Sequence, residues 1–163
     1  MRIPIFIILT GLLKLSAASD KKTVSESIPQ FSLPRLLNTQ LVTNKDIEGK
    51  LTVIDFWASW CGPCEDALPF YRKLYDDFHG KGLEILAVSL DSEISEAEGY
   101  IKKNKAPFLY TIDKTLDFKR TLEIKAIPTT FLVSKKGEIL LRVRGTDDKG
   151  LELIRSKIKE ELK

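Results

Sequence analysis

The sequence predicts an α/β fold in which helices flank a central mixed β-sheet. Apolar runs of strand length alternate with helical patterns along most of the chain, which is typical of parallel strands joined by helices. Near the C-terminus, two neighbouring strand patterns flank Lys135-Lys136-Gly137, which predicts a β-hairpin with a glycine at its turn. This hairpin would give the sheet an antiparallel edge.

The first half of the chain predicts a small N-terminal β-hairpin, a central strand and a long helix. Apolar residues between 28 and 42 surround the turn residues 38–40. Leu51–Phe56 is an apolar run broken by one acid, which is typical of a strand covered on both faces. The helix, expected from Cys61 to about His79, has an apolar stripe at helical spacing, formed by Ala67, Tyr71, Leu74 and Phe78.

The second half continues the alternation of strands and helices. We expect a buried strand at 83–90, a helix at 93–104, a short strand at 107–112, a weaker helix at 115–124 and strands at 129–133 and 138–144. A final helix begins near Asp147, which can cap it.

The first 18 residues have the order of a secretory signal peptide. Arg2 gives a positive start, residues 3–13 form an apolar core, and small residues follow at 16–19. This core is shorter than the roughly 20 residues that span a bilayer. We therefore expect export to the periplasm or cell envelope, although an uncleaved leader that tethers the protein to a membrane stays open.

Composition limits the remaining organisation and the partners. We expect a linker at 19–27 and one domain at 28–163, present as a monomer. The chain carries 26 Lys and Arg against 23 Asp and Glu, a net charge of +3. These charges are interspersed, and the leader would take two positive ones away, so we expect no nucleic-acid partner.

Both cysteines of the chain lie in one motif, Cys61-Gly62-Pro63-Cys64. Two intervening residues let a helix begin at or just after Cys61 and place both sulfurs on its first turn. A helix N-terminus has unpaired N–H groups and partial positive charge, which stabilise a thiolate. We therefore expect the pKa of Cys61 to fall from about 8.5 towards about 7, close to the optimum for disulfide exchange.

Three other interpretations of the cysteines are weaker. A zinc half-site lacks ligands, because the chain has no further cysteine and a single histidine, His79. A structural disulfide across so short a loop would contribute only about 2 kcal/mol. Two unrelated buried cysteines would not explain the residues that flank them. We expect no metal and no organic cofactor.

Two stretches and one proline resemble the thioredoxin-fold proteins. The stretches are VIDFWASWCGPC at 53–64 and IPTTFLV at 127–133, and the proline is Pro69. The sequence PQFSL at 29–33 and an extra segment at 91–107 are similar to the exported TlpA/ResA-like branch. The resemblance covers the chain from about Ile28 to the C-terminus, and it implies a thioredoxin-like fold with an N-terminal β-hairpin extension.

The resemblance also implies roles for the site residues. Cys61 would be the exposed nucleophile and Cys64 the resolving thiol. A cis bond before Pro128 would turn the backbone of Ile127 towards an extended substrate. The Gly62-Pro63 pair goes with reducing members of the family. The two tryptophans would lie under the site and beside it, and a direct contact between Trp60 and substrate stays open.

Asp55 is the predicted acid of the site. An acid inside the central strand should be largely buried, which raises its pKa and lets it accept and return the Cys64 proton. Many TlpA/ResA-like proteins have a glutamate three residues after the second cysteine, where this chain has Ala67. Asp55 could instead be a structural residue paired with water or a backbone donor.

We therefore predict an exported thiol:disulfide oxidoreductase that reduces protein disulfides and, by family resemblance, takes electrons from a membrane-embedded thiol donor. A disulfide oxidase or isomerase using the same cysteines is one alternative. A thiol peroxidase on the same fold is another, and a non-enzymatic binding module is a third.

Overall fold

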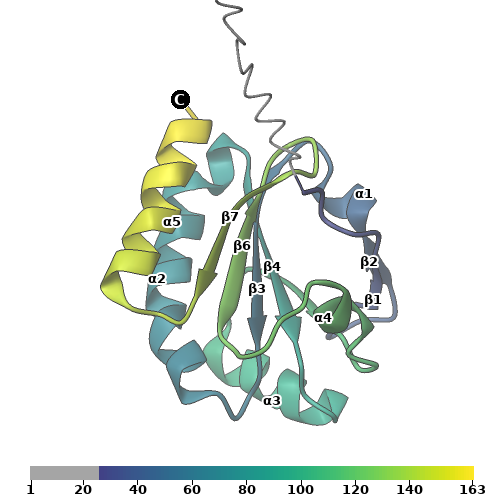
Figure 1. Cartoon of the computed structure of the whole chain (residues 1–163). Coiled ribbons are helices and arrows are strands. Elements are labelled where there is room, and N and C mark those ends of the chain that lie inside the picture. The colour runs from purple at the N-terminus through teal and green to yellow at the C-terminus, as the bar shows by residue number, and fades with distance from the viewer. Residues whose placement is uncertain (1–25) are drawn as a thin grey trace, which may run out of the picture.

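A computed structural model describes residues 26–163, so the predicted signal peptide and most of the predicted linker lie outside the described residues. A five-stranded sheet of order β5-β4-β3-β6-β7 forms the centre (Figure 1). Its strands are β3 (Leu51–Trp57), β4 (Leu83–Ser89), β5 (Leu109–Ile112), β6 (Thr129–Val133) and β7 (Ile139–Arg144). β3, β4 and β5 are parallel, whereas β6 and β7 pair antiparallel. The predicted mixed sheet is confirmed.

Helices and a two-stranded sheet cover the two faces of the central sheet (Figure 1). Helices α2 (Gly62–Phe78) and α5 (Asp148–Glu161) pack on one face. The other face is covered by the two-stranded sheet and two short helices. These elements are β1 (Ser32–Pro34), β2 (Leu41–Thr43), α1 (Asn44–Ile47) and α4 (Asp117–Thr121). Helix α3 (Ile94–Asn104) lies at the end of the sheet where β3 stops and α2 begins.

The predicted elements differ from the observed ones mainly in the short helices. The N-terminal hairpin is confirmed, since β1 and β2 pair antiparallel. Helix α1 was not predicted; it begins with a capping box between Thr43 and Asp46. The predicted helix at 115–124 is reduced to α4, and Leu116 and Glu123 on either side of it have positive φ angles, which do not continue a helix. A short 3-10 turn, η1 (His79–Lys81), follows α2 near Gly80.

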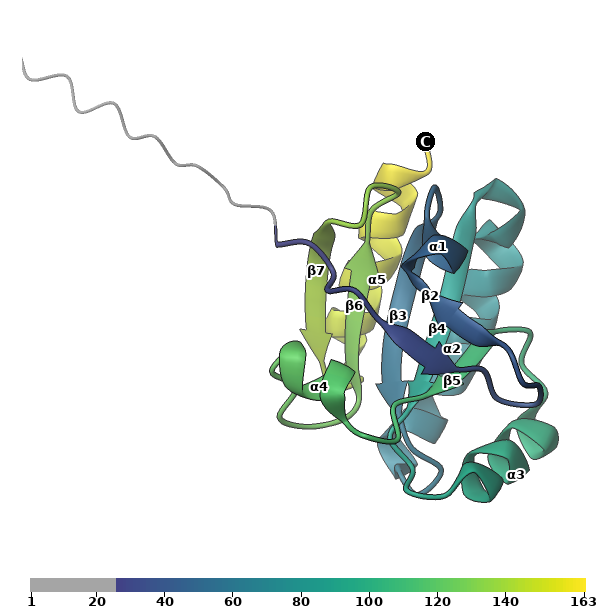
Figure 2. The same ribbon diagram turned by 90° about the vertical axis from the view of Figure 1, so that its right-hand side faces the viewer.

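The segment before β2 crosses one face of the sheet from edge to edge (Figure 2). Beside β7, the Ile28 N–H donates to the Gly137 carbonyl at 2.8 Å. At the opposite edge, the Leu36 N–H donates to the Tyr110 carbonyl of β5 at 2.9 Å. Because exposed strand edges can pair with other chains, these contacts protect parts of both edges. They also join the segment to the domain at two distant points.

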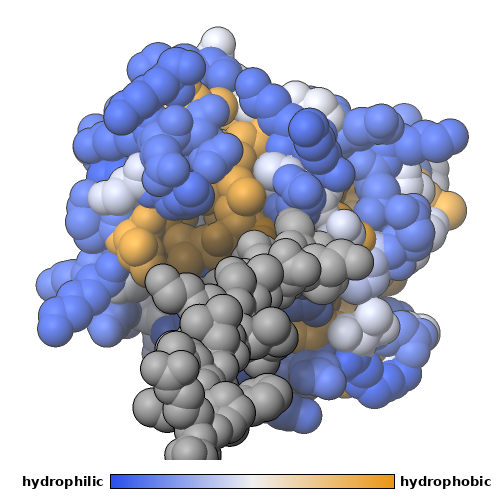
Figure 3. Space-filling view, turned by 45° about the horizontal axis from the view of Figure 1, so that its top comes forward, coloured by the Kyte–Doolittle hydropathy of each residue, from blue (hydrophilic) through white to orange (hydrophobic). Residues whose placement is uncertain are grey.

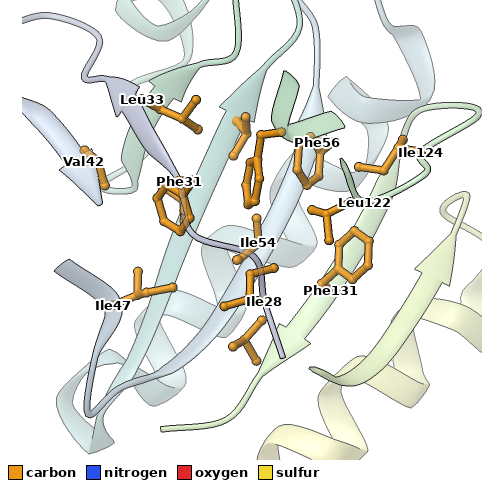
Figure 4. Packing of buried hydrophobic residues seen from close by; sticks show 14 residues of the cluster. Ile28, Phe31, Leu33, Val42, Ile47, Ile54, Phe56, Leu122, Ile124 and Phe131 are labelled. Carbon is orange, nitrogen blue, oxygen red and sulfur yellow. The ribbon is translucent and has the colours of Figure 1, made fainter. Parts of the chain in front are cut away.

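Aromatic residues fill the space under this segment (Figure 4). The Phe31 ring lies 4.8 Å from the Phe118 ring, and Phe118 lies 5.5 Å from Phe56 of β3. Phe131 of β6 completes the group at 6.1 Å from Phe56. The crossing segment therefore supplies part of the main core and does not merely lie on it.

The end of the domain that carries the β6–β7 turn lies away from the start of α2. Figure 3 looks obliquely onto this end, and its visible surface is mostly hydrophilic, with hydrophobic side chains showing in the middle. Within residues 26–163, every helix falls short of the length and apolar character needed to cross a membrane.

Replacing Phe31 with alanine tests the role of the crossing segment. Phe31 is 8% exposed, so Phe31→Ala should lower the free energy of unfolding by about 3 kcal/mol. Urea denaturation measures this change. Leu41→Ala is the control, because Leu41 is 60% exposed and its loss should change the stability by less than about 0.5 kcal/mol. Equal effects of the two substitutions would show that the segment is not part of the core.

Candidate active site

The two cysteines lie where β3 ends and α2 begins. Cys61 is the N-cap residue of α2, and Pro63 occupies its first turn. The N–H groups of Cys64 and Glu65 donate to the Cys61 carbonyl at 3.1 and 3.2 Å. Cys61 and Cys64 form a disulfide bond. The expected placement of both sulfurs on the first turn of a helix is confirmed.

Exposure does not separate the two cysteines in this disulfide form. Cys61 is 7% exposed and Cys64 is 8% exposed, which differs from the expectation of an exposed Cys61. The physical reason is packing, since both cysteines belong to an apolar cluster that includes Trp57, which is 4% exposed. The residues next to Cys61 in sequence are exposed: Trp60 is 68% exposed, and the Gly62-Pro63 pair is exposed as well.

The loop before β6 lies against the same cluster. The peptide bond between Ile127 and Pro128 is cis, as the family resemblance implied. Ile127 is half-buried and packs on the cluster that contains both cysteines, while Pro128 is buried. Among residues 26–163, neither backbone group of Ile127 has a hydrogen-bond partner. Ile127 therefore offers a free N–H and a free carbonyl next to the site.

Asp55 lies in the middle of β3 on the side that faces α2. It is 7% exposed, as expected for an acid inside the central strand. Its Oδ1 accepts a hydrogen bond from the Thr130 hydroxyl at 2.9 Å and one from the Tyr71 hydroxyl at 3.2 Å. The two hydroxyl oxygens are 2.7 Å apart. Strand β6 and helix α2 thus each supply one hydroxyl group to the carboxylate.

Burial dominates the electrostatics of Asp55. Loss of hydration raises its pKa to about 6, and the hydrogen bonds from Thr130 and Tyr71 offset only part of this increase. Burial and the nearby carboxylate also raise the pKa of Tyr71 well above its usual range, so Tyr71 keeps its proton and can act as a donor. Asp55 can therefore gain or lose a proton close to neutral pH.

A small cavity of about 20 Å³ brings Asp55 and Cys64 onto one surface. Its other lining residues are mostly aromatic and include Trp57, Tyr100 and Tyr110. The Trp57 indole N–H and the Tyr110 hydroxyl are buried and have no hydrogen-bond partner in the described part of the chain. Cys61 does not line this cavity. The two sulfurs therefore differ in what lies beside them, although their exposure is similar.

Tyr71 and Thr130 were missed as site residues by the sequence analysis. Tyr71 was assigned only to the apolar stripe of α2, and Thr130 only to a strand. The pairing of β3 with β6 places Thr130 directly opposite Asp55. A buried carboxylate needs hydrogen-bond donors. The hydroxyl groups on the strand and helix that cover Asp55 could therefore have identified Tyr71 and Thr130 from the sequence.

The described residues contain no group of three or more His, Cys, Asp or Glu side chains arranged to hold a metal ion. His79 lies at the other end of α2, where it stacks on Tyr75 with a ring separation of 4.2 Å.

The raised pKa of Asp55 predicts how stability depends on pH. The pKa rises from 3.8 to about 6 on folding, so the folded state holds this proton more tightly than the unfolded chain. As the pH rises from about 4 to about 6, the free energy of unfolding should therefore decrease by an amount on the order of 3 kcal/mol. Asp55→Asn should remove this loss and be the more stable protein at pH 8, as urea denaturation of the disulfide form would show.

Tyr71→Phe is the matched variant. It removes a donor that stabilises the ionised carboxylate and so raises the pKa of Asp55 in the folded state, and the loss of stability should therefore continue to higher pH than in the wild type. A wild-type profile that is flat from pH 4 to pH 8, or one that Asp55→Asn does not change, would contradict the assignment.

Comparison with known proteins supports the chemistry of this site. Residues 24–142 match the AhpC/TSA family. The chain is 31% identical over 153 residues to the thiol-disulfide oxidoreductase ResA of Oceanobacillus iheyensis, which covers 88% of this chain and 80% of the relative. It is 30% identical over 139 residues to the sporulation thiol-disulfide oxidoreductase A of Bacillus subtilis, covering 83% and 84% of the two chains.

A solved structure agrees with the expected thioredoxin-like fold. The crystal structure of a Chlorobium tepidum protein assigned as thiol:disulfide interchange protein DsbE has a TM-score of 0.80 at 30% identity, with coverage of 85% of this chain and 97% of that chain. The chain belongs to the AhpC/TSA family, and within this thioredoxin-fold family it is a thiol-disulfide oxidoreductase similar to ResA.

Proposed function

We propose that this protein reduces disulfide bonds in other proteins, with Cys61 as the attacking thiolate and Cys64 as the resolving thiol. One observation carries the proposal. The redox-active pair lies on the first turn of α2, and Cys64 shares a cavity with a buried acid whose pKa is about 6. This arrangement places a thiolate-stabilising helix end and a proton acceptor at different members of one cysteine pair.

The reaction proceeds through two exchanges. The Cys61 thiolate attacks one sulfur of the substrate disulfide, which forms a mixed disulfide and releases the other substrate sulfur as a thiolate. Cys64 loses its proton to Asp55 and attacks the Cys61 sulfur. The Cys61–Cys64 disulfide forms and the second substrate thiolate leaves. The substrate gains two electrons, and the cysteine pair loses them.

The surroundings of the two sulfurs support this order. Cys61 is the N-cap residue of α2, where the end of the helix stabilises a thiolate, so we assign the first attack to it. Cys64 lines the small cavity with Asp55. A thiol that needs a base only in the second exchange is well served by a buried acceptor beside it.

The cavity also suits the proton transfer from Cys64 to Asp55. Its volume of about 20 Å³ is enough for one water molecule, which needs roughly 10–15 Å³. Trp57 and Tyr110 line the same cavity, and the Trp57 N–H and the Tyr110 hydroxyl, which have no partner among the described residues, would be suitable partners for such a water. We infer that the proton moves through this water.

Substrate binding is assigned to the exposed rim of the site. An extended segment of substrate can pair with the free N–H and carbonyl of Ile127, in the manner of an added strand, while Pro128 fixes the loop. Trp60, Gly62 and Pro63 provide the facing surface. This mode recognises backbone and suits substrates of varied sequence.

The compartment and the electron supply follow from the leader and from the family resemblance. The first 18 residues have the pattern of a signal peptide, so we place the protein in the periplasm or cell envelope. We further propose that it acts there as a monomer. Outside the cytoplasm the oxidised pair must be reduced again. A membrane-embedded thiol carrier is the donor that fits this location.

The direction of the reaction is tested by the reduction potential of the Cys61–Cys64 pair. A reductant should have a potential below about −200 mV against glutathione buffers, and it should accelerate the reduction of insulin by dithiothreitol. A potential near −120 mV, which is typical of a strong oxidant, would reverse the proposed direction. The variant with both cysteines replaced by serine is the control for the insulin assay.

The order of attack is tested by trapping. Cys64→Ser should hold the mixed disulfide, because no thiol remains to displace Cys61, and captured substrates should appear on non-reducing gels of the exported fraction. Cys61→Ser should capture far fewer, since the first attack is lost. Capture by Cys61→Ser alone would show that Cys64 is the nucleophile.

A further inference from the structure

We propose that Asp91 is a positioning residue for disulfide exchange: its buried carboxylate fixes the turn Ala58–Cys61, which carries both Trp60 and the attacking cysteine. This inference rests on the proposed function. Asp91 lies two residues after the end of β4 and is 1% exposed. It is distant from the turn in sequence and meets it only through the parallel pairing of β3 and β4.

Both carboxylate oxygens of Asp91 accept hydrogen bonds. The Ser59 N–H lies 3.1 Å from each oxygen, and the Ser59 hydroxyl donates to Oδ1 at 2.7 Å. The Ser89 hydroxyl donates to Oδ2 at 2.7 Å and accepts from the Asp91 N–H at 3.0 Å. Ser89 thus orients the carboxylate, and the carboxylate holds Ser59 by its backbone and its side chain.

Ser59 occupies the position at which the turn can be controlled. The Cys61 N–H donates to the Ala58 carbonyl at 3.1 Å, which closes a turn with Ser59 and Trp60 as its central residues. The Trp60 side chain is 68% exposed, so its own packing gives little restraint. Among the described residues, the side-chain hydrogen bonds that hold this turn are those between Ser59 and Asp91.

Capping of the next helix does not explain Asp91. The N-cap residue of α3 is Glu93, and all the side-chain hydrogen bonds of Asp91 go to Ser59 and Ser89. Hydrogen bonds to a buried charged group are among the stronger ones in proteins. A neutral residue at this position would hold the turn less firmly.

Two substrates of different size separate positioning from folding. A protein disulfide must fit against Trp60 and the Cys61 turn, whereas 2-hydroxyethyl disulfide needs only the sulfur. Asp91→Asn should lower kcat/KM for insulin roughly tenfold and change the rate with 2-hydroxyethyl disulfide less than about twofold. Ser59→Ala should give a smaller loss of the same kind, and Ser59→Thr, which keeps the hydroxyl, should restore most of it.

Asp113→Asn is the matched control. Asp113 is also 1% exposed and follows the neighbouring strand β5, but its carboxylate accepts from the Lys119 N–H of α4 at 2.7 Å. It should lower stability and leave the ratio of the two rates as in the wild type. If Asp91→Asn does not fold, Ser59→Ala still gives the test, because Ser59 is only half-buried.

The outcomes are distinct. A selective loss with insulin in the Asp91 and Ser59 variants, absent from Asp113→Asn, supports the positioning role. If the wild type is active, the positioning role would be overturned by equal losses with both substrates in the Asp91 and Ser59 variants, or by no loss at all. It would also be overturned if Asp113→Asn showed the same selective loss with insulin. A wild type that fails to reduce insulin would overturn the proposed function and the positioning role together.

Discussion

The central position of β3 constrains the whole site. β3 is hydrogen-bonded to β4 on one side and β6 on the other, and all seven of its residues are buried. Side chains alternate between faces, so Ile54 and Phe56 face the aromatic core while Asp55 faces α2. A shift of one residue would place the acid among the phenylalanines. The apolar core therefore fixes the register that delivers Asp55 to the cysteines.

The pKa of Asp55 is set by two opposing effects, the loss of hydration and the hydrogen bonds from two hydroxyl groups. Two hydroxyl groups stabilise the ionised carboxylate, yet the loss of hydration outweighs them and leaves the pKa near 6. An apolar residue here would avoid that cost, but it could not serve as the proposed acceptor of the Cys64 proton. The same burial that weakens the fold above pH 6 brings the pKa of Asp55 close to neutral, which suits its proposed role as a proton acceptor.

The sequence was sufficient for the regular elements and for the reactive pair. The strand at 129–133 was predicted with its observed bounds, and β3 is one residue longer than predicted. A short continuous apolar run between turn residues is typical of a buried strand, which explains this agreement. Four-residue α1 was missed, although Thr43 and Asp46 form a recognisable capping box. Short helices depend on local caps more than on periodicity, which explains both this omission and the excess length predicted for α4.

Contacts between distant segments could not be predicted in the same way. Ser59 and Asp91 are 32 residues apart, and Asp55 and Thr130 are 75 apart. Each pair meets because two strands are neighbours in the sheet, and strand order was not available from the pattern of elements. The resemblance to a family supplied the chemistry of the cysteines, but it did not identify the groups that hold Asp55 and the Cys61 turn in place.

The two carboxylates beside the site illustrate how surroundings decide a role. Asp91 accepts hydrogen bonds on both oxygens, all from Ser59 and Ser89. Asp55 accepts its two hydrogen bonds on a single oxygen and borders a small cavity. A carboxylate with every oxygen bonded holds its neighbours in place, whereas one with a free oxygen beside a cavity can exchange a proton. The hydrogen bonding of the two buried carboxylates thus agrees with the proposed role of Asp91 as an anchor and of Asp55 as a proton acceptor.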